Sequence, residues 1–362
     1  MAIVNSIVKN YTKIIAIDTA KNSFQVCVGR TDGEGKVKQY KFSRSKFHDG
    51  IVKLGIDGSA IVMEACATSH NWGRLFQKDG FTVLLVAPQH AKKYLKNTRM
   101  KNDANDAEAI YVCSLQHNTR FIKVKTLEDS AIASLHTNRH ACVKNMVEAG
   151  NRMRGCAAEF GIVVAKGHSH IKDLLAIIDS PEKMATLNIP DIAQWNLTKL
   201  AETYRHAQKM LDEVTEMIVG YGETSALIQC AMSCPGIGPI TASALVAKIS
   251  DGSAFDNGRQ LAAFLGLVPS QNSTGGKSTL GKISKTGDRY LRALLCQCAH
   301  SIIRFSEHRT KECKDTQLDR FVMRLKANHK AGCNIAIALA NKMARIVWAL
   351  LKRGVKFETK VA

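Results

Sequence analysis

The sequence predicts a mixed α/β domain at the N-terminus, then a pair of long helices, then a mainly helical C-terminal region. Short runs of β-branched residues bounded by turn signals recur over the first quarter of the chain, which is typical of strands. From about residue 125 the apolar residues instead recur every three or four positions, which indicates helices. The third observation is charge, because 51 Lys and Arg stand against 31 Asp and Glu in 362 residues.

The excess of basic residues predicts a polyanionic partner. The formal net charge is +20, and residues 258–362 alone hold 20 Lys and Arg against 6 Asp and Glu. A field of this size attracts nucleic acid in particular, whereas a merely solvated basic surface is the weaker alternative. We expect a cytosolic protein without a membrane segment, because no stretch approaches the roughly 18 uninterrupted apolar residues of a membrane helix and no secretion signal begins the chain.

The eleven cysteines are scattered singly, so we expect reduced and mostly buried thiols rather than disulfides. Structural zinc is the sharper alternative, at Cys230-x₃-Cys234 or at Cys296-x-Cys298-x-His300. Neither segment has the two-residue spacing of common zinc knuckles, which disfavours zinc.

The N-terminal elements are expected in the order β-β-β-α-β-α-β. This order is the layout of the ribonuclease H-like fold, in which the first and fourth strands lie side by side. The expected strands are 14–18 and its continuation 23–28 after a turn, 37–42, 60–63 and 81–86, the expected helices are 46–55 and 71–78, and a basic helix begins at 88–97.

Two carboxylates stand at strand exits in this predicted sheet. Asp18 follows the apolar residues 14–17, and Glu64 follows the apolar residues 60–63. A carboxylate at the end of a buried strand needs a cation, a proton or a hydrogen-bond donor. Taken alone, an acid in the position of Asp18 is more often the cap of a turn that follows a strand.

Asp103 and Asp106 form a second acidic pair, three residues apart and therefore on one face of a predicted helix. Alone they resemble the acid cluster that is common at a helix N-terminus. Together with the two strand-exit acids they predict a site for Mg²⁺ or Mn²⁺, because the ligands are all carboxylates. Such an ion activates a nucleophile at a phosphodiester and stabilises the leaving oxygen.

Residues 125–220 predict an antiparallel helical hairpin or coiled coil. The first helix has an apolar stripe interrupted by Arg139: Leu135, Cys142, Met146, Ala149, Met153, Cys156 and Phe160. After a polar segment with two proline turns, the second helix has a seam at spacings of four and three: Leu200, Tyr204, Ala207, Leu211, Val214 and Ile218. The seam packs internally or joins protomers, and a long hairpin favours an oligomer.

The C-terminal region opens with Pro-Gly-Ile-Gly, residues 235–238, between two predicted helices. This pattern resembles a helix-hairpin-helix element, in which Gly236 and Gly238 let backbone N–H groups approach a phosphate. The alternative is a plain turn between helices.

A loop rich in glycine and hydroxyl groups, residues 266–277, precedes a run of basic residues. Ser273 and Thr274 are the candidate nucleophiles there. Composition favours a phosphate-binding loop over an ordinary flexible one, and the spacing is not that of a Walker loop. The expected nucleic-acid contacts are Gly275, Gly276, Lys277, Lys282, Lys285, Arg289 and Arg292.

These motifs resemble the DEDD transposases of the insertion-sequence one-ten family and the related Piv-type DNA invertases, over nearly the whole chain. Asp18, Glu64, Asp103 and Asp106 match the four acids of that family's RuvC-like domain. Residues 235–239, 261–269 and the run from 273–277 through 287–292 match its C-terminal transposase domain, and this final run is the most specific. The family often has two serines before the glycines, and here the second is Thr274, which favours Ser273 as the nucleophile over Thr274 or Ser270.

The resemblance implies a recombinase in which the acids bind Mg²⁺ and act with a serine that links covalently to DNA. It further implies a structured bridge RNA that pairs with target and donor DNA, and a homodimer or homotetramer in which one protomer's acids face another's serine. The implied domains are a RuvC-like domain at 1–124, a coiled-coil connector at 125–222 and a transposase domain at 223–362.

Two other functions fit parts of the pattern. A metal-dependent junction nuclease would hydrolyse DNA with water and use Ser273 only to bind phosphate. A degenerate relative would bind structured RNA without catalysis, although four clustered carboxylates without a metal are costly to keep.

Overall fold

The computed structural model describes residues 7–95, 103–167, 169–187, 189–274, 277–312, 316–328 and 331–358. The chain divides into two compact units, Met1–Glu128 and Asp129–Ala362. The domain boundary expected after residue 124 is close to this division. The boundary expected after residue 222 falls inside the second unit, near the end of a long helix.

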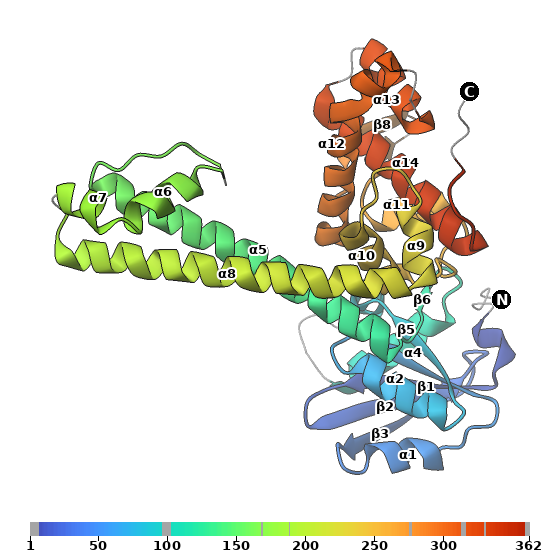
Figure 1. The fold of residues 1–362 in the computed structure, drawn as a ribbon. Coiled ribbons are helices and arrows are strands. Elements are labelled where there is room, and N and C mark those ends of the chain that lie inside the picture. The colour runs from blue at the N-terminus through green and yellow to red at the C-terminus, as the bar shows by residue number, and fades with distance from the viewer. Residues whose placement is uncertain are drawn as a thin grey trace. The chain divides into compact units, whose positions relative to one another are not determined.

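The first unit is a mixed α/β domain built on one six-stranded sheet (Figure 1). The strand order is β3-β2-β1-β4-β5-β6, and β1 pairs in parallel with β4 and β4 with β5. The expected strand and helix order is confirmed, and only the short β6 was missed. The elements are β1 Lys13–Thr19, β2 Ser23–Arg30, β3 Lys38–Ser43, α1 Phe47–Lys53, β4 Ser59–Glu64, α2 Ser69–Lys78, β5 Thr82–Val86, α3 Pro88–Ala91, α4 Asp103–Leu115 and β6 Phe121–Ile122.

Alternating side chains give the sheet two apolar faces. Ile15 and Ile17 of β1 belong to a core that includes the rings of Phe47 and Trp72 from α1 and α2. Ile14 and Ala16, like Ala60 and Val62 of β4, belong to the opposite core, to which Ala107, Ile110 and Tyr111 of α4 contribute. The residues that follow Ala16 and Val62 in this alternation are Asp18 and Glu64, so the sheet directs both toward the α4 face.

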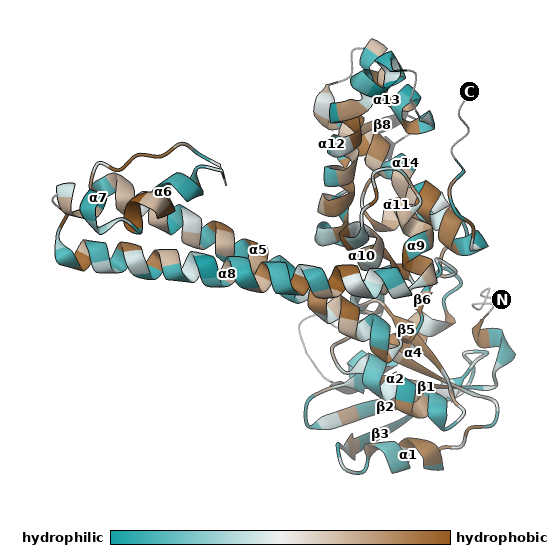
Figure 2. Ribbon diagram, viewed as in Figure 1, coloured by the Kyte–Doolittle hydropathy of each residue, from teal (hydrophilic) through white to brown (hydrophobic). Residues whose placement is uncertain are grey.

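The second unit begins with the predicted helical hairpin. Helices α5 (Leu127–Glu159) and α8 (Asp191–Thr224) lie side by side and antiparallel (Figure 1). Both change between hydrophilic and hydrophobic segments along their length (Figure 2). The seam is used within the chain, and Ala201 is buried in place of the expected Leu200, which is half-buried. Arg139 interrupts the stripe because its Nε donates to Thr215 Oγ1 of α8 at 3.1 Å.

Two helices that the sequence did not predict, α6 (Ile171–Ile178) and α7 (Pro181–Thr186), fill the polar segment between α5 and α8. Ile171, Leu174 and Met184 share a core with Met153 of α5 and Leu197 of α8. The helices of this segment were not predicted because the short apolar helix α6 follows several polar residues.

The C-terminal part is helical except for one β-hairpin. Its elements are α9 Ala226–Met232, α10 Pro239–Ile249, α11 Gly258–Phe264, β7 Pro269–Thr274, β8 Lys277–Ile283, α12 Arg289–Lys311, α13 Gln317–Ala327 and α14 Gly332–Arg353. One continuous core includes Leu245 of α10, Leu295 of α12, and Leu339 and Met343 of α14. In the described part of the chain, α14 is the one helix long and apolar enough to cross a membrane by length and composition, and half of its apolar stretch is buried in this unit.

His136 of α5 ties the hairpin to this C-terminal core. Its imidazole is 5% exposed, and its Nε2 lies 2.9 Å from Ser243 Oγ of α10 while its Nδ1 lies 3.2 Å from the Tyr290 hydroxyl of α12. Burial, with a smaller effect of Arg139, lowers the pKa of His136 to about 4. Because Ser243 Oγ donates to the Pro239 carbonyl, the neutral ring donates from Nε2 and accepts at Nδ1.

Candidate active site

The parallel pairing of β1 with β4 places Asp18 and Glu64 at the same end of adjacent strands. Ile17 pairs with Met63, and each carboxylate is the next residue along its strand. Neighbouring strands lie about 5 Å apart, and both side chains belong to the face that α4 covers. Each is half-buried. The sheet therefore brings together the two strand-exit acids, as the sequence predicted.

Asp106 of α4 is an acid near Glu64. Burial raises the pKa of Glu64, the charge of Asp106 raises it further, and the charge of Lys92 opposes the shift. Asp106 therefore lies close enough to Glu64 for the two negative charges to repel each other. Asp103 begins the same helix, but its side chain lies outside the described residues.

The chemistry of these donors fits a hard divalent cation. Carboxylate oxygens are the ligands of Mg²⁺ and Mn²⁺, and a cation would relieve the repulsion between Glu64 and Asp106. Among the described side chains, no three His, Cys, Asp or Glu come close enough to hold an ion. This is compatible with Mg²⁺, which usually takes one or two carboxylates and completes its shell with water and substrate phosphate.

A pocket of about 590 Å³ opens beside these strand ends. Its lining includes Cys66, which the sequence analysis did not single out. Lys21, Arg44, Cys66 and Thr68 line it, together with Thr19. The Cys66 thiol lies 2.8 Å from Thr19 Oγ1. Burial acts to raise its pKa, but hydrogen bonds from Thr19, Thr68 and Ser69 outweigh burial and leave the pKa lowered. The position of Cys66, two residues after Glu64, was the only sequence signal.

The segment around Ser273, expected as a phosphate-binding loop with an ordinary flexible loop as the alternative, forms the β7–β8 hairpin. Ser273 pairs with Ser278 and Thr274 with Lys277 in an antiparallel register. Gly275 and Gly276 lie outside the described residues, as do the side chains of Ser273, Thr274 and Lys277. Ser270, the least favoured nucleophile, donates its hydroxyl to the Lys282 carbonyl at 3.0 Å, which gives it a structural role.

The Gly287-Asp288 pair of the most specific motif holds the base of this hairpin. A side chain at Gly287, whose φ is +77°, would overlap the Phe264 carbonyl oxygen, and one at Gly266, whose φ is +68°, would overlap the backbone of Thr286. Asp288 caps α12 by accepting from the backbone N–H groups of Tyr290 and Leu291 at 2.9 and 3.1 Å. The motif therefore fixes where the hairpin leaves the helical core.

The predicted phosphate-binding cations divide into two kinds. Lys282, Lys285 and Arg289 are exposed. Arg292 is half-buried, and its Nη1 donates to the Leu265 and Thr286 carbonyls at 2.9 and 3.0 Å, which braces the same hairpin base. This structural role was not apparent from sequence, since any of the four could have been exposed.

The Pro-Gly-Ile-Gly turn joins α9 to α10 as expected. A side chain at Gly236, whose φ is +82°, would lie 2.7 Å from Ile302 Cδ1 of α12, so packing alone explains this glycine. Gly238 precedes α10 as its N-cap, and no atom lies within 4 Å of its open side. Of the two glycines in this turn, only Gly238 has an open side that another molecule could approach.

The cysteines of the zinc alternative serve the core instead. Cys298 Sγ lies 3.2 Å from Thr241 Oγ1, and Cys230 Sγ donates to the Val355 carbonyl at 2.9 Å. Burial raises the pKa of Cys234 to about 12. Most of the described cysteines are buried free thiols, as expected.

Comparison with known proteins identifies the family. Residues 15–161 match a model of DEDD transposases of the IS110 type, and residues 228–314 match the model described as "Transposase IS116/IS110/IS902 family". A probable family 20 transposase of Pseudomonas aeruginosa is 37% identical over 342 residues, which cover 94% of this chain and 96% of that protein. The chain belongs to the IS110 family of transposases.

Two further relatives show the breadth of this family. The transposase for insertion sequence element IS1111A of Coxiella burnetii is 33% identical over 343 residues, 94% of this chain and 90% of that protein. The pilin gene-inverting protein of Moraxella bovis is 21% identical over 360 residues, 96% of this chain and 98% of that protein.

Membership makes this IS110 transposase an enzyme that cuts and rejoins DNA, with DNA as its partner. The first matched segment contains Asp18, Glu64, Asp103 and Asp106, and the second contains the β7–β8 hairpin with Ser273. Both candidate groups of reactive residues therefore lie in the segments that define the family.

Proposed function

We propose that this transposase exchanges DNA strands through a RuvC-like metal site and a serine nucleophile. The site residues are Asp18, Glu64, Asp103 and Asp106, and the nucleophile is Ser273. The observation that carries the proposal is the meeting of Glu64, at the exit of β4, with Asp106 of α4, beside the exit of β1 at Asp18. That arrangement concentrates negative charge that would hold a divalent cation, and the bound cation would in turn stabilise a DNA phosphate.

The serine step exchanges one phosphate ester for another. Ser273 Oγ attacks the phosphorus of a DNA phosphodiester, the Oγ–P bond forms, and the bond from phosphorus to the leaving deoxyribose oxygen breaks. The serine proton passes to a base, and the leaving oxygen takes up a proton. Bound Mg²⁺ or Mn²⁺ would supply charge stabilisation at the phosphate. The bond energy is kept in the phosphoserine link, so rejoining needs no external energy source.

The test compares Ser273→Ala with Thr274→Ala and Ser270→Ala on a DNA substrate that traps covalent protein–DNA species. We expect Ser273→Ala alone to lose the trapped species and Asp18→Asn to lose all cleavage. Cleavage by Ser273→Ala at the wild-type rate would instead support hydrolysis by water and refute the serine mechanism.

Guidance by a structured bridge RNA is the second part of the proposal. It is supported by the +20 charge, which suits two polyanions, and by the family resemblance. Recombination should require a transcript from the DNA that flanks the gene. Equal recombination after complete removal of RNA would rule guidance out.

The proposed homodimer or homotetramer no longer draws support from the α5–α8 seam, because the hairpin closes that seam itself. Support comes instead from apolar side chains that α8 leaves exposed, notably Ile192 at 79% and Trp195 at 63%. Surfaces of this kind often mark protein interfaces. The mass of the protein in solution tests this, and Trp195→Ser should weaken any assembly.

A further inference from the structure

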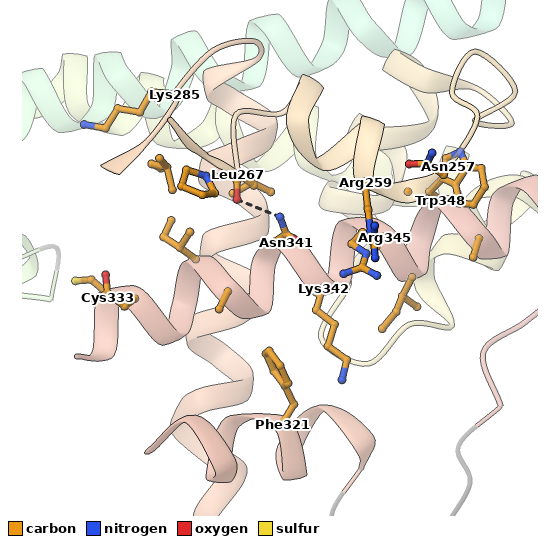
Figure 3. Close-up of a pocket in the computed structure, with 18 of the residues that line it drawn as sticks. Asn257, Arg259, Leu267, Lys285, Phe321, Cys333, Asn341, Lys342, Arg345 and Trp348 are labelled. Carbon is orange, nitrogen blue, oxygen red and sulfur yellow. Dashed lines mark hydrogen bonds between the residues drawn. The ribbon is translucent and has the colours of Figure 1, made fainter. Parts of the chain in front are cut away.

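A wide pocket lies in the second unit, between α11, α13, α14 and the base of the β7–β8 hairpin (Figure 3). Its volume is about 1190 Å³, above the range of roughly 300–1,000 Å³ that is typical for small ligands. Asn341 Nδ2 of α14 donates to the Leu267 carbonyl at 3.1 Å, which ties the pocket wall to the segment leading into β7. This hydrogen bond therefore links α14 to the segment that leads into the hairpin.

The lining is cationic and contains no carboxylate. Within the described part of the chain, none of its six basic side chains forms an ion pair with Asp or Glu. Basic side chains elsewhere in this unit do find acids, such as Lys326 with Glu307 at 2.7 Å. The six are Arg259, Lys282, Lys285, Arg324, Lys342 and Arg345.

Three of these cations are held close together. Lys342 Nζ lies 4.3 Å from the centre of the Phe321 ring, and the Arg324 guanidinium lies 5.5 Å from the same ring. Burial lowers the pKa of Lys342, and the charges of Arg324 and Arg345 lower it further. The positive charges of Lys342, Arg324 and Arg345 thus repel one another, and no acidic side chain among the described residues pairs with them. A bound anion would relieve this repulsion.

The position of the pocket favours a particular polyanion. Pro269, Lys282 and Ile283 line it and also form the base of the hairpin that carries Ser273. Ser273 lies four positions after Pro269 along the strand, which corresponds to about 13 Å. An anion that extends over this distance from the pocket to Ser273 has to be a polymer. A DNA strand is such a polymer and has phosphates along its whole length.

We propose that this pocket binds the phosphate backbone of the DNA strand on which the hairpin acts, a few nucleotides from the phosphate that Ser273 attacks. The choice of DNA rests on the proposed function, whereas the existence of an anion site rests on the six cations alone. Lys342 and Arg345 are its central contacts, since α14 presents both from one rigid helix.

The test measures the affinity for labelled single-stranded and duplex DNA of arbitrary sequence over a series of salt concentrations, in a Ser273→Ala background. Lys342→Gln with Arg345→Gln removes two phosphate contacts, so the slope of log K against log salt should become shallower by about 1.4–1.8. Affinity at low salt should fall by about tenfold or more. Arg259→Gln with Arg324→Gln, both exposed, provides a second pair should the first disturb folding.

The matched control is Lys144→Gln with Lys209→Gln, which removes the same charge from lysines already paired with Glu148 and Glu213 at 3.7 and 3.8 Å. Its salt slope should stay at the starting value, and Lys342→Arg should retain the slope as well. Equal slopes for pocket and control pairs would overturn the proposal, as would an effect seen only with a structured RNA probe. The serine mechanism can fail independently, because covalent trapping by Ser273 is a separate measurement.

Discussion

Lowering the pH from about 7.5 to about 5 should destabilise the second unit through His136, by about 2 kcal/mol. In the unfolded chain this imidazole takes up a proton near pH 6.5, but burial delays protonation in the native state until about pH 4. Between these values the unfolded state binds more protons, so the free energy of unfolding falls as the pH falls. The deficit reaches its full value, roughly 3 kcal/mol, only below about pH 4.

Thermal unfolding followed by circular dichroism at a series of pH values measures this effect. The melting temperature of the second unit should fall by roughly 4–8 °C at pH 5, given 2–4 °C per kcal/mol for a unit of this size. His136→Gln should remove that part of the pH dependence, because an amide can donate to Ser243 and accept from Tyr290 without titrating. His206→Gln, at an exposed position on α8, is the control. Equal pH dependence in wild type and His136→Gln would refute the assignment of a neutral, buried His136.

Three further predictions concern the site and its frame. Glu64→Gln should abolish cleavage and the stabilisation of the protein by Mg²⁺, while its melting temperature without metal stays equal or rises, because a repelled carboxylate is removed; stabilisation by Mg²⁺ equal to that of wild type would contradict the metal role. Gly287→Ala should cost about 3 kcal/mol or more of unfolding free energy, whereas Gly220→Ala, with no atom within 4 Å, should gain about 0.5–1 kcal/mol; denaturant titration measures both. Asp319→Ala should cost about 1.5–3 kcal/mol, because it removes charge-assisted hydrogen bonds to Arg309, whose Nε lies 3.0 Å from both carboxylate oxygens and whose side chain is 31% exposed; a loss under 1 kcal/mol in the same titration would show that these hydrogen bonds are not formed in solution.

The first unit was predictable because its signals are local. Each strand is a short apolar run, and the pairing of β1 with β4 follows from the strand order. The two-residue β6 was missed since Phe121 and Ile122 are too few to form a pattern. On α8 the periodic seam was found, but its first position was expected at Leu200 instead of the buried Ala201, because leucine is the more apolar residue and the small alanine is the one that fits between close helices.

At the site, the acids were found because Asp18 and Glu64 interrupt apolar runs. The hairpin around Ser273 was not, because Ser, Thr, Gly and Lys have no strand periodicity and the ladder is held by backbone pairing. The cationic pocket was missed for another reason. Lys342 and Arg345 lie within an apolar helix, and nothing local links them to Arg259 or Lys282.

The backbone packing at the base of the β7–β8 hairpin affects how inactive copies of a transposase gene are recognised from sequence. Gly266, Gly287 and Asp288 fit backbone against backbone and cap α12, and none of them has to react with DNA. A copy whose Ser273 codon had mutated would keep this frame and still fold. Detecting the motif therefore reports an intact scaffold, and a survey that counts mobile elements able to move has to check the serine and the acids separately.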